Sequence, residues 1–430
     1  MPTLFSTFDD VWHYLDEMPK FSQKGGAAVH YSLDSVKAFC AAMDDPQKKL
    51  RAVHVAGTNG KGTTCQMLAS VYQQAGFKAG LYTSPHLNRF NERIRINASM
   101  IPDEAILQFF QQFETTLRQI PLTYFELSTC LGFWYLEKEK VDIALIETGM
   151  GGRLDATNVL DPAACVITSV GLDHTDFLGE TLREIAREKG GIIKPDRPVI
   201  IGCLPPEAEE VIVEMAEKNH SRLIRTCRHS VLPANSIFEL KEGDKTVTIP
   251  LGKRKKIDAV NIAVCRAVTD QLQEELRVNS ADFCTGIEKV DERFREHAHF
   301  QQLDDSLEWY FDGAHNAEAI KSLLDHLNGF SADRPPILFL SMMKDKAKPE
   351  VLRQLSDFST VYYIDMNLPR SAPCSQIRAE IPSVRCFSSE EKEVLTVLDQ
   401  LKTELVIFTG SFYFYSEIKK WMASLTPSED

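Results

Sequence analysis

Long apolar runs are missing from this sequence. No stretch approaches the roughly 20 consecutive apolar residues that cross a bilayer. The opening residues, MPTLFSTFDDVWHYLDEM, carry acidic side chains early and lack the basic region and apolar core of a secretory signal. The sequence therefore predicts neither a membrane protein nor a secreted one, and we expect a cytoplasmic location.

Closely paired cysteines are missing too. The 10 cysteines are scattered over the expected strands and helices, and none of them forms a C-x-x-C pair. Structural zinc sites usually take two ligands from such a pair. We therefore expect reduced thiols, mostly buried as small apolar side chains, and no zinc site.

Positive charge is in short supply. Lys and Arg number 48 against 61 Asp and Glu, which gives a formal net charge of −13. The single basic run, Lys253 to Lys256, is predicted to be a solvated loop. This balance argues against nucleic acid or an anionic membrane as the main partner. An anionic ligand would have to be bound locally, within a chain whose 430 residues suffice for two or three domains.

Such a local anion site is indicated between Leu50 and Ala75. Val53 and Val55 lie in an apolar run that predicts a strand, and a helical pattern opens at Thr63. Between them, glycines allow backbone N–H groups to surround an anion at a helix N-terminus. The spacing departs from the general phosphate-loop pattern, because a glycine and not Ser or Thr follows Lys61. The predicted loop comprises Gly57, Thr58, Asn59, Gly60, Lys61, Gly62, Thr63 and Thr64.

Polar residues follow several of the other predicted strands. Ser84 comes after a short strand that ends near Tyr82, Glu147 ends the apolar run 141–146, and His174 follows the strand 165–169. Strands and helices alternate here, which predicts an α/β fold with a doubly wound parallel sheet. The carboxyl ends of parallel strands share one edge of a sheet, so we expect these side chains to lie near Lys61. The other predicted elements are a strand at 198–201, helices at 34–43, 103–119, 129–138, 181–189 and 259–275, a solvated loop at 88–94 and a hairpin within 232–251.

A second alternation of strands and helices begins at Leu307. It predicts a smaller α/β domain, in which Asp312 and His315 follow the strand 309–311. We place the boundary in the polar segment before it, which gives domains at 1–297 and 298–430. The remaining predicted elements are helices at 317–327, 350–358 and 391–401 and strands at 337–340, 361–364 and 405–408.

These residues together predict a nucleotide site with one or two divalent metals. Oxygen and imidazole ligands from Ser84, Glu147 and His174 suit Mg²⁺ or Mn²⁺. Either hydrolysis that drives motion or phosphoryl transfer to a substrate oxygen is possible with such a site. A second domain with its own polar cluster favours transfer to a bound substrate.

Seven motifs together resemble the folylpolyglutamate synthases, which are often also dihydrofolate synthases and are members of the Mur ligase superfamily. They are GTNGKGT, TSPHL with the following ERI, ETGMGGRLDATN, ITSVGLDHTDFLG, REKGGIIKP, DGAHN and SMMKDK. The resemblance runs from about Met18 to the C-terminal strands. It implies a Mur-ligase-like ATPase domain followed by a smaller, Rossmann-like glutamate-ligase domain.

The implied reaction is ATP-dependent amide formation. The carboxylate of a folate or of dihydropteroate would be phosphorylated, and the amine of L-glutamate would attack the acyl phosphate. The resemblance assigns Gly57 to Thr64 to the ATP phosphates, Ser84 and Glu147 to one Mg²⁺, and His174 to a second. Lys189 would be carbamylated by CO₂, although a cation favoured by the helix dipole explains it equally well. Asp312 and His315 would meet ATP and glutamate, and the remaining residues would contact the nucleotide (Asn261, Arg293) or line the pterin side (Thr123, Phe125, Arg153, Asp155, Ala156).

Some positions depart from the family pattern, and two other functions stay open. Ile257-Asp258 replaces the expected His-Gln before Asn261, and Asp291-Glu292 replaces Pro-Gly before Arg293. Ala347 directly follows SMMKDK, at the position where the family signature has its last acid. A peptidoglycan-precursor ligase would need a nucleotide-sugar domain, for which the roughly fifty residues before the phosphate loop leave no room. The other alternative is a nucleotide-binding regulator without ligase activity. We expect a monomer that acts on small molecules.

Overall fold

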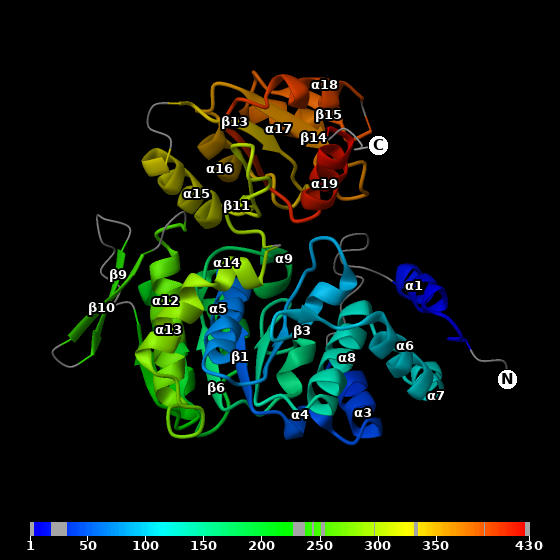
Figure 1. Ribbon diagram of the computed structural model, residues 1–430, viewed down its shortest axis with the longest axis vertical. Coiled ribbons are helices and arrows are strands. Elements are labelled where there is room, and N and C mark those ends of the chain that lie inside the picture. Colours follow the sequence, from blue (N-terminus) through cyan, green and yellow to red (C-terminus); the bar gives the residue numbers. More distant parts are fainter. Residues whose placement is uncertain are drawn as a thin grey trace. The chain divides into compact units, whose positions relative to one another are not determined.

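The computed structural model describes residues 4–18, 32–226, 237–242, 245–250, 254–295, 297–330, 334–390 and 392–425. The chain divides into two compact units (Figure 1). The first contains residues 1–252 and 257–295, and the second contains residues 253–256 and 296–430. The short segment 253–256 therefore groups with the second unit, although its sequence neighbours on both sides belong to the first. The domain boundary at 297/298 remains a prediction.

An eight-stranded sheet forms the centre of the first unit, in the order β4-β3-β2-β5-β1-β6-β7-β8. All neighbours from β2 to β8 are parallel, whereas β3 and β4 add an antiparallel edge. This confirms the predicted parallel-rich α/β fold. The strands are β1 (Ala52–Ala56), β2 (Ala79–Tyr82), β3 (Ile94–Ile96), β4 (Ser99–Met100), β5 (Ile143–Glu147), β6 (Ala164–Ile167), β7 (Val199–Ile201) and β8 (Leu223–Arg225).

The central strands are buried on both faces, because their alternate side chains enter different cores. On β1, Val53 and Val55 belong to a core with Leu145 of β5 and Val166 of β6, whereas Ala56 faces the opposite way. These strands are consequently largely apolar in the sequence.

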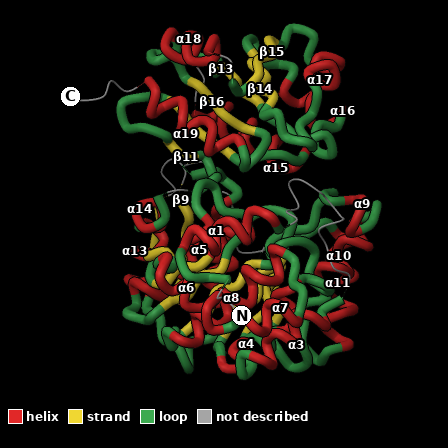
Figure 2. The backbone as a smooth tube through the Cα atoms, turned by 90° about the vertical axis from the view of Figure 1, so that its right-hand side faces the viewer, coloured by secondary structure: helices red, strands yellow, loops and turns green. Residues whose placement is uncertain are grey.

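Helices cover both faces of this sheet (Figure 2). The Val53 face packs against α5 (Lys61–Gln74), α12 (Asp258–Gln271) and α13 (Ser280–Glu288). The other face packs against α3 (Asp34–Ala42), α6 (Asp103–Gln112) and α8 (Tyr124–Lys138) over one half, and against α10 (Leu182–Gly190) and α11 (Pro206–Lys218) over the other. Further helices are α1 (Phe8–Glu17), α4 (Pro46–Lys49), α7 (Glu114–Gln119), α9 (Thr175–Leu178), α14 (Val290–Arg293) and the 3₁₀ turns η2 (Phe90–Arg93) and η3 (Ala156–Val159).

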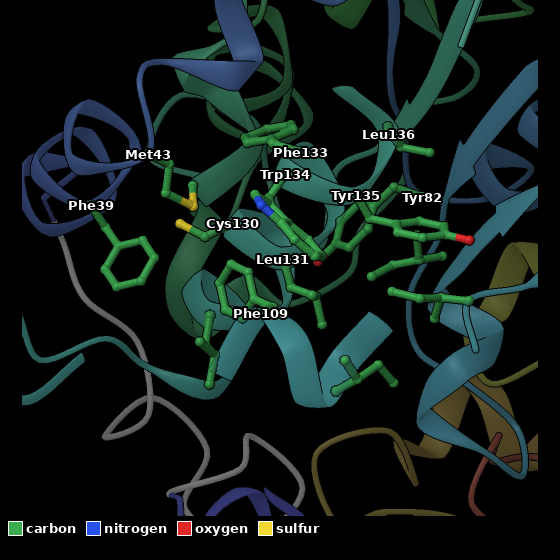
Figure 3. Packing of buried hydrophobic residues seen from close by; sticks show 14 of the residues in the cluster. Phe39, Met43, Tyr82, Phe109, Cys130, Leu131, Phe133, Trp134, Tyr135 and Leu136 are labelled. Carbon is green, nitrogen blue, oxygen red and sulfur yellow. The ribbon is translucent and has the colours of Figure 1, made fainter. Parts of the chain in front are cut away.

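Aromatic side chains fill the core beneath α8 (Figure 3). Trp134 of α8 packs edge-on against Phe109 of α6 at 5.4 Å between ring centroids. Tyr82 ends β2 in the same core, and its hydroxyl lies 2.8 Å from the Ser128 hydroxyl. Its phenol is therefore buried with a hydrogen-bond partner, as a polar group in a core requires.

Two predictions for this unit were wrong. The helix expected at 103–119 is interrupted at Phe113, whose side chain enters the core between α6 and α7. The segment 88–94, predicted to be a solvated loop, is mostly buried. The Glu92 carboxylate accepts hydrogen bonds from the backbone of Leu87 and Asn88, and the Arg93 guanidinium donates to His86 Nδ1 at 2.8 Å. Nearby protein groups thus provide the hydrogen bonds for Glu92 and Arg93 that the sequence pattern led us to expect from water.

The second unit contains a six-stranded sheet in the order β11-β12-β16-β13-β14-β15, parallel except for β11. Its strands are β11 (Gln301–Gln302), β12 (Trp309–Asp312), β13 (Ile337–Leu340), β14 (Val361–Asp365), β15 (Arg385–Ser388) and β16 (Val406–Thr409). Its helical segments are α15 (Ala317–Phe330), α16 (Pro349–Leu352), η4 (Arg353–Leu355), α17 (Cys374–Glu380), α18 (Lys392–Gln400) and α19 (Phe414–Leu425). The sequence did not predict α17, β15 or α19, and the helix expected at 350–358 consists of α16 and η4.

Two further predictions were wrong in this unit. Cys374 and Cys386 form a disulfide with a Cα–Cα distance of 6.2 Å, so these two thiols are not reduced. Lys255, which was expected in a solvated loop, is only 4% exposed and forms an ion pair with Asp312.

The predicted hairpin is present as β9 (Ile237–Glu242) and β10 (Lys245–Pro250), which pair antiparallel. The rest of the predicted hairpin, at 232–236, 243–244 and 251, lies outside the described residues. In the described parts of the chain, none of the helices has the length and apolar character needed to cross a membrane.

Candidate active site

The predicted phosphate loop leads directly from β1 into α5, which begins at Lys61. Gly60 has a left-handed φ of 83°, and a Cβ there would lie 2.7 Å from Asn261 Oδ1. A Cβ at Gly57 would lie 1.9 Å from Thr168 Oγ1. Glycine is therefore required at both positions. At Gly60 both the backbone conformation and the lack of space require it, and at Gly57 the lack of space does.

Side chains from the end of β6 hold this loop in place. The Thr168 hydroxyl donates to Asn59 O at 2.7 Å, and Asn59 N donates to Ser169 Oγ at 2.9 Å. Thr58 N donates to Ser169 O at 3.0 Å. We did not single out these two hydroxyl residues from the sequence. The available signal was their position directly after an apolar strand, within the motif ITSVGLDHTDFLG.

Two ammonium groups converge on the loop. Lys61 Nζ donates to Gly57 O at 3.0 Å, and Lys189 Nζ, from α10, donates to the same oxygen at 2.9 Å. Lys189 is only 3% exposed. The positive end of the 14-residue helix α5 adds to their charge. This end of the loop is therefore suited to a polyanion such as a nucleotide triphosphate.

A buried carboxylate lies beside the first turn of α5. Glu147, at the end of β5, is 4% exposed, and its Oε2 accepts the backbone N–H of Ser84 at 3.0 Å. Burial raises the pKa of Glu147 to about 7, although the Lys61 charge and the Ser84 N–H oppose the shift. A Cβ at Gly62 would lie 3.4 Å from the same oxygen. Glu147, Ser84 and the loop are thus brought together as predicted from strand order.

His174 occupies the N-cap of α9 with a left-handed φ of 49°, and its backbone N–H donates to Asp173 Oδ1 at 2.8 Å. Over the described ranges, no three or more His, Cys, Asp or Glu side chains gather into a cluster that could hold a metal. A second metal at His174 therefore stays a prediction from the resemblance.

The residues predicted for the pterin side lie on α8 and on the loop after β5. Asp155 is buried, and its carboxylate accepts the backbone N–H groups of Gly149 and Met150 at 2.8 and 2.9 Å. Its other oxygen accepts Thr157 N at 3.0 Å and the Thr157 hydroxyl. Burial raises the pKa of Asp155 although these donors lower it. Asp155 therefore shapes the Gly149–Thr157 turn.

Four further pterin-side candidates lie within this turn or at the start of α8. Phe125 packs over Gly149, where a Cβ would come within 2.5 Å of its ring, and Thr123 caps α8 by accepting Glu126 N. Ala156 is buried at the start of η3. Arg153 is exposed and pairs with Glu188, one residue before Lys189, at 2.9 Å.

The two predicted nucleotide contacts on the α12–α14 side differ in position. Asn261 lies at the loop, with its Oδ1 at 3.5 Å from Thr64 Oγ1. The Arg293 guanidinium instead donates to Ser70 Oγ at 2.9 Å and to Gln74 Oε1 at 2.7 Å. Ser70 lies about 13 Å along α5 from Lys61 at about 1.5 Å rise per residue. The structure therefore does not bring Arg293 to the loop, and its contact with the nucleotide stays a prediction.

Asp312 and His315 belong to the second unit. Asp312 ends β12 and is 1% exposed. The backbone N–H of Ala314 donates to Asp312 Oδ1 at 3.0 Å, and the His315 imidazole lies 2.7 Å from Gly313 O through Nδ1. Because a carbonyl only accepts hydrogen bonds, that contact requires the proton of the imidazole on Nδ1.

Both units match known protein families. The Mur ligase middle domain matches residues 55–263, and the Mur ligase glutamate ligase domain matches residues 298–412. A Bacillus subtilis protein named dihydrofolate synthase/folylpolyglutamate synthase is 32% identical over 440 residues, which cover 97% of this chain and 99% of that relative. The chain belongs to the folylpolyglutamate synthase family of Mur ligases.

Other members of the folylpolyglutamate synthase family agree. The folylpolyglutamate synthase of Lacticaseibacillus casei is 31% identical over 88% of this chain and 91% of its own length. The structure of E. coli FolC in complex with DHPP and ADP superposes with a TM-score of 0.83 at 27% identity, covering 99% of both chains. The predicted family, Mur ligase fold and ATP-dependent ligation of glutamate to folates are thereby confirmed.

Proposed function

We propose that this enzyme activates a folate carboxylate by phosphorylation from ATP and then joins it to the amine of L-glutamate. A carboxylate is a poor electrophile, whereas an acyl phosphate carries a leaving group. The amine attacks the acyl carbon, phosphate departs, and ADP and phosphate are released. The observation that carries the proposal is the convergence of Lys61 and Lys189 on Gly57 O, at a helix N-terminus beside the buried Glu147.

Lys61 and the loop amides are proposed to hold the ATP phosphates. Glu147 and Ser84 fit a Mg²⁺ ion, because this ion is usually held by one or two carboxylates together with water and substrate phosphates. The carboxylate of Glu147 is buried and, within the described part of the chain, accepts a hydrogen bond from the Ser84 N–H alone, which suits a cation partner. When bound, Mg²⁺ would offset charge as the γ-phosphoryl group moves. His174 is proposed for a second ion.

Lys189 is proposed to react with CO₂ to form a carbamate. The neutral amine attacks carbon, a proton leaves, and the cation becomes an anion that can direct a metal or a phosphate. Bicarbonate should then stimulate turnover, and the mass of a peptide containing residue 189 should rise by that of CO₂. An unmodified Lys189 in an active enzyme would exclude this role.

The folate is proposed to bind beside Thr123, Phe125, Arg153, Asp155 and Ala156. Their positions support this proposal. Thr123 and Phe125 lie at the start of α8, and the other three follow β5, the strand that ends in Glu147. Asn261 and Arg293 are proposed for the nucleotide, and Asp312 and His315 for ATP and glutamate. Dihydropteroate is proposed as a second acceptor, and we further propose that the enzyme acts in the cytoplasm as a monomer.

Glutamate-dependent ADP release tests the proposal. We expect release with tetrahydrofolate, and with dihydropteroate if the enzyme is bifunctional. Lys61→Ala and Glu147→Ala should each abolish it. Retained turnover in folded, purified variants would refute the assigned site. Intact ATP binding without glutamate addition in the wild type would instead favour a nucleotide-binding regulator.

A further inference from the structure

The Asp312 carboxylate is almost completely enclosed. Its Oδ2 accepts the backbone N–H of Phe300 at 2.9 Å, and its Oδ1 accepts that of Ala314 at 3.0 Å. The third partner is the ammonium of Lys255, at 2.9 Å from Oδ2. Only 1% of the Asp312 side chain and 6% of the Lys255 side chain are exposed. The charge of Asp312 is therefore balanced by one buried cation.

This ion pair is built into the turn that carries His315. Asp312 fixes Ala314 from within the turn, and it fixes Phe300 from the segment that leads into β11. Gly313 N donates to Ala298 O at 2.9 Å, and the Thr409 hydroxyl of β16 donates to Ala314 O at 3.2 Å. The backbone immediately before His315 is therefore held in part by the Asp312 carboxylate, which accepts the Ala314 N–H.

Lys255 reaches this turn from a distant part of the sequence. It lies between β10 and α12, which belong to the first unit, in the segment that groups with the second. Its neighbour Lys256 is exposed. A basic run of this kind normally stays in solvent, because burying an ammonium is costly unless a carboxylate and good geometry compensate. The ion pair with Asp312 thus accounts for the burial of Lys255.

We propose that Lys255 is a positioning residue for the ligase reaction, which holds the Asp312 carboxylate and through it the turn that presents His315. The inference rests on the proposed roles of Asp312 and His315 and adds a residue that the family motifs do not contain. Without the cation, Asp312 would be left buried and charged with only backbone donors, and the turn would adopt other conformations to reach water.

The test compares Lys255→Met with Lys256→Met, the same substitution at an adjacent exposed position. We expect Lys255→Met to lower kcat for glutamate-dependent ADP release at least tenfold, with the Kd for folate, measured by quenching of intrinsic fluorescence, unchanged. Lys256→Met should retain wild-type kcat within twofold. Lys255→Arg keeps the charge and should recover most of the activity lost in Lys255→Met.

Hydrogen exchange gives a readout that does not depend on activity. The N–H groups of Phe300 and Ala314, which donate to Asp312, should exchange at least tenfold faster in Lys255→Met than in the wild type or in Lys256→Met. If the wild type ligates nothing, the proposed function fails, and this exchange result still decides whether Lys255 holds the turn.

Two outcomes would overturn the inference. One is a folded Lys255→Met enzyme with wild-type kcat and unchanged exchange at Phe300 and Ala314. The other is a folded Lys255→Arg enzyme that is as inactive as Lys255→Met, because the charge would then not be what matters. If Lys255→Met cannot be obtained folded, Lys255→Arg alone decides, since activity within threefold of the wild type supports the inference and a tenfold loss refutes it.

Discussion

Lys61 and Lys189 donate to one carbonyl oxygen from two different helices. Two like charges at such close quarters repel each other, and an anion placed beside them relieves the repulsion. A bound triphosphate would provide that anion for Lys61, and a carbamate on Lys189 would remove one of the two positive charges. The phosphate loop is therefore electrostatically suited to its ligand before the ligand arrives.

His54 in the middle of β1 allows a pH prediction. Its Nε2 lies 2.7 Å from Thr157 Oγ1, whose own proton goes to the Asp155 carboxylate, so His54 must donate. Burial lowers the pKa of His54 from 6.5 to about 3. Between pH 6.5 and about 3, His54 is therefore protonated in the unfolded chain and neutral in the folded chain. The free energy of unfolding falls as the pH drops through this range.

We expect the wild type to lose about 2 kcal/mol more stability than His54→Gln between pH 7 and pH 5, from about 1.4 kcal/mol per pKa unit. Glutamine keeps an N–H donor but does not titrate. Urea unfolding at the two pH values measures the difference. Parallel losses in both proteins would show that His54 is not the titrating group.

At the scale of elements, the parts that the sequence predicts well are those governed by local burial. β1, β5 and β6 are largely apolar because both faces of the sheet are covered, and the polar residues at their carboxyl ends are predicted to form its functional edge. The burial of segment 88–94 could not be predicted. A pattern of alternating charges is the same in a solvated loop and in a buried turn where Glu92 accepts backbone N–H groups. β15 and α17 are short and only partly buried, and they carry too little periodicity to be recognised.

The loop geometry predicts different costs for two glycines. Gly60 and Gly76 both have left-handed φ values, 83° and 90°, but only Gly60 has a neighbour where a Cβ would be. Gly76→Ala should cost about 1 to 2 kcal/mol of stability and leave the Kd for ATP unchanged. Gly60→Ala should lose the same amount of stability from its backbone conformation and should also weaken ATP binding at least tenfold. Thermal unfolding and nucleotide titration separate the two effects, and equal ATP affinity in both variants would contradict the crowding at Asn261.

The disulfide joins the start of α17 to β15 across 12 residues. Closing a loop of this length should stabilise the second unit by about 3 kcal/mol in the chain-entropy description. Cys374→Ser should therefore lower the urea midpoint of the oxidised protein, and reductant should do the same to the wild type. Cys284→Ser, at a partly buried cysteine outside this disulfide, is the control. Insensitivity of the wild type to reductant would show that the bond does not contribute.

At the scale of the whole molecule, the division into two units could be anticipated from the renewed strand–helix alternation after Leu307. That segment 253–256 belongs to the second unit could not be anticipated, because nothing in the sequence Lys253 to Lys256 distinguishes the buried Lys255 from the exposed Lys256. Its partner Asp312 lies more than fifty residues later. Only the fold brings the two together, and the same holds for Thr168 and Ser169 at the phosphate loop.

A fragment of residues 298–430 should be less stable than the second unit of the intact chain. It retains the buried Asp312 but lacks Lys255, and removing one partner of a buried ion pair costs about 3 to 5 kcal/mol. With Trp12 and Trp134 of the first unit replaced by phenylalanine in the intact chain, the fluorescence of the buried Trp309 and Trp421 during urea unfolding reports on this unit. The intact chain with Lys255→Met should show a similar loss. A fragment as stable as the intact second unit would mean that segment 253–256 contributes little.

Segment 253–256 also limits where chimaeric proteins can be spliced between two relatives. A chimaera spliced once, near residue 296, would combine the ammonium of one parent with the carboxylate of the other. Parents that lack a cation at position 255 would then leave an acid buried without a counterion. A second splice that transfers 253–256 together with the second unit keeps Lys255 and Asp312 from the same parent.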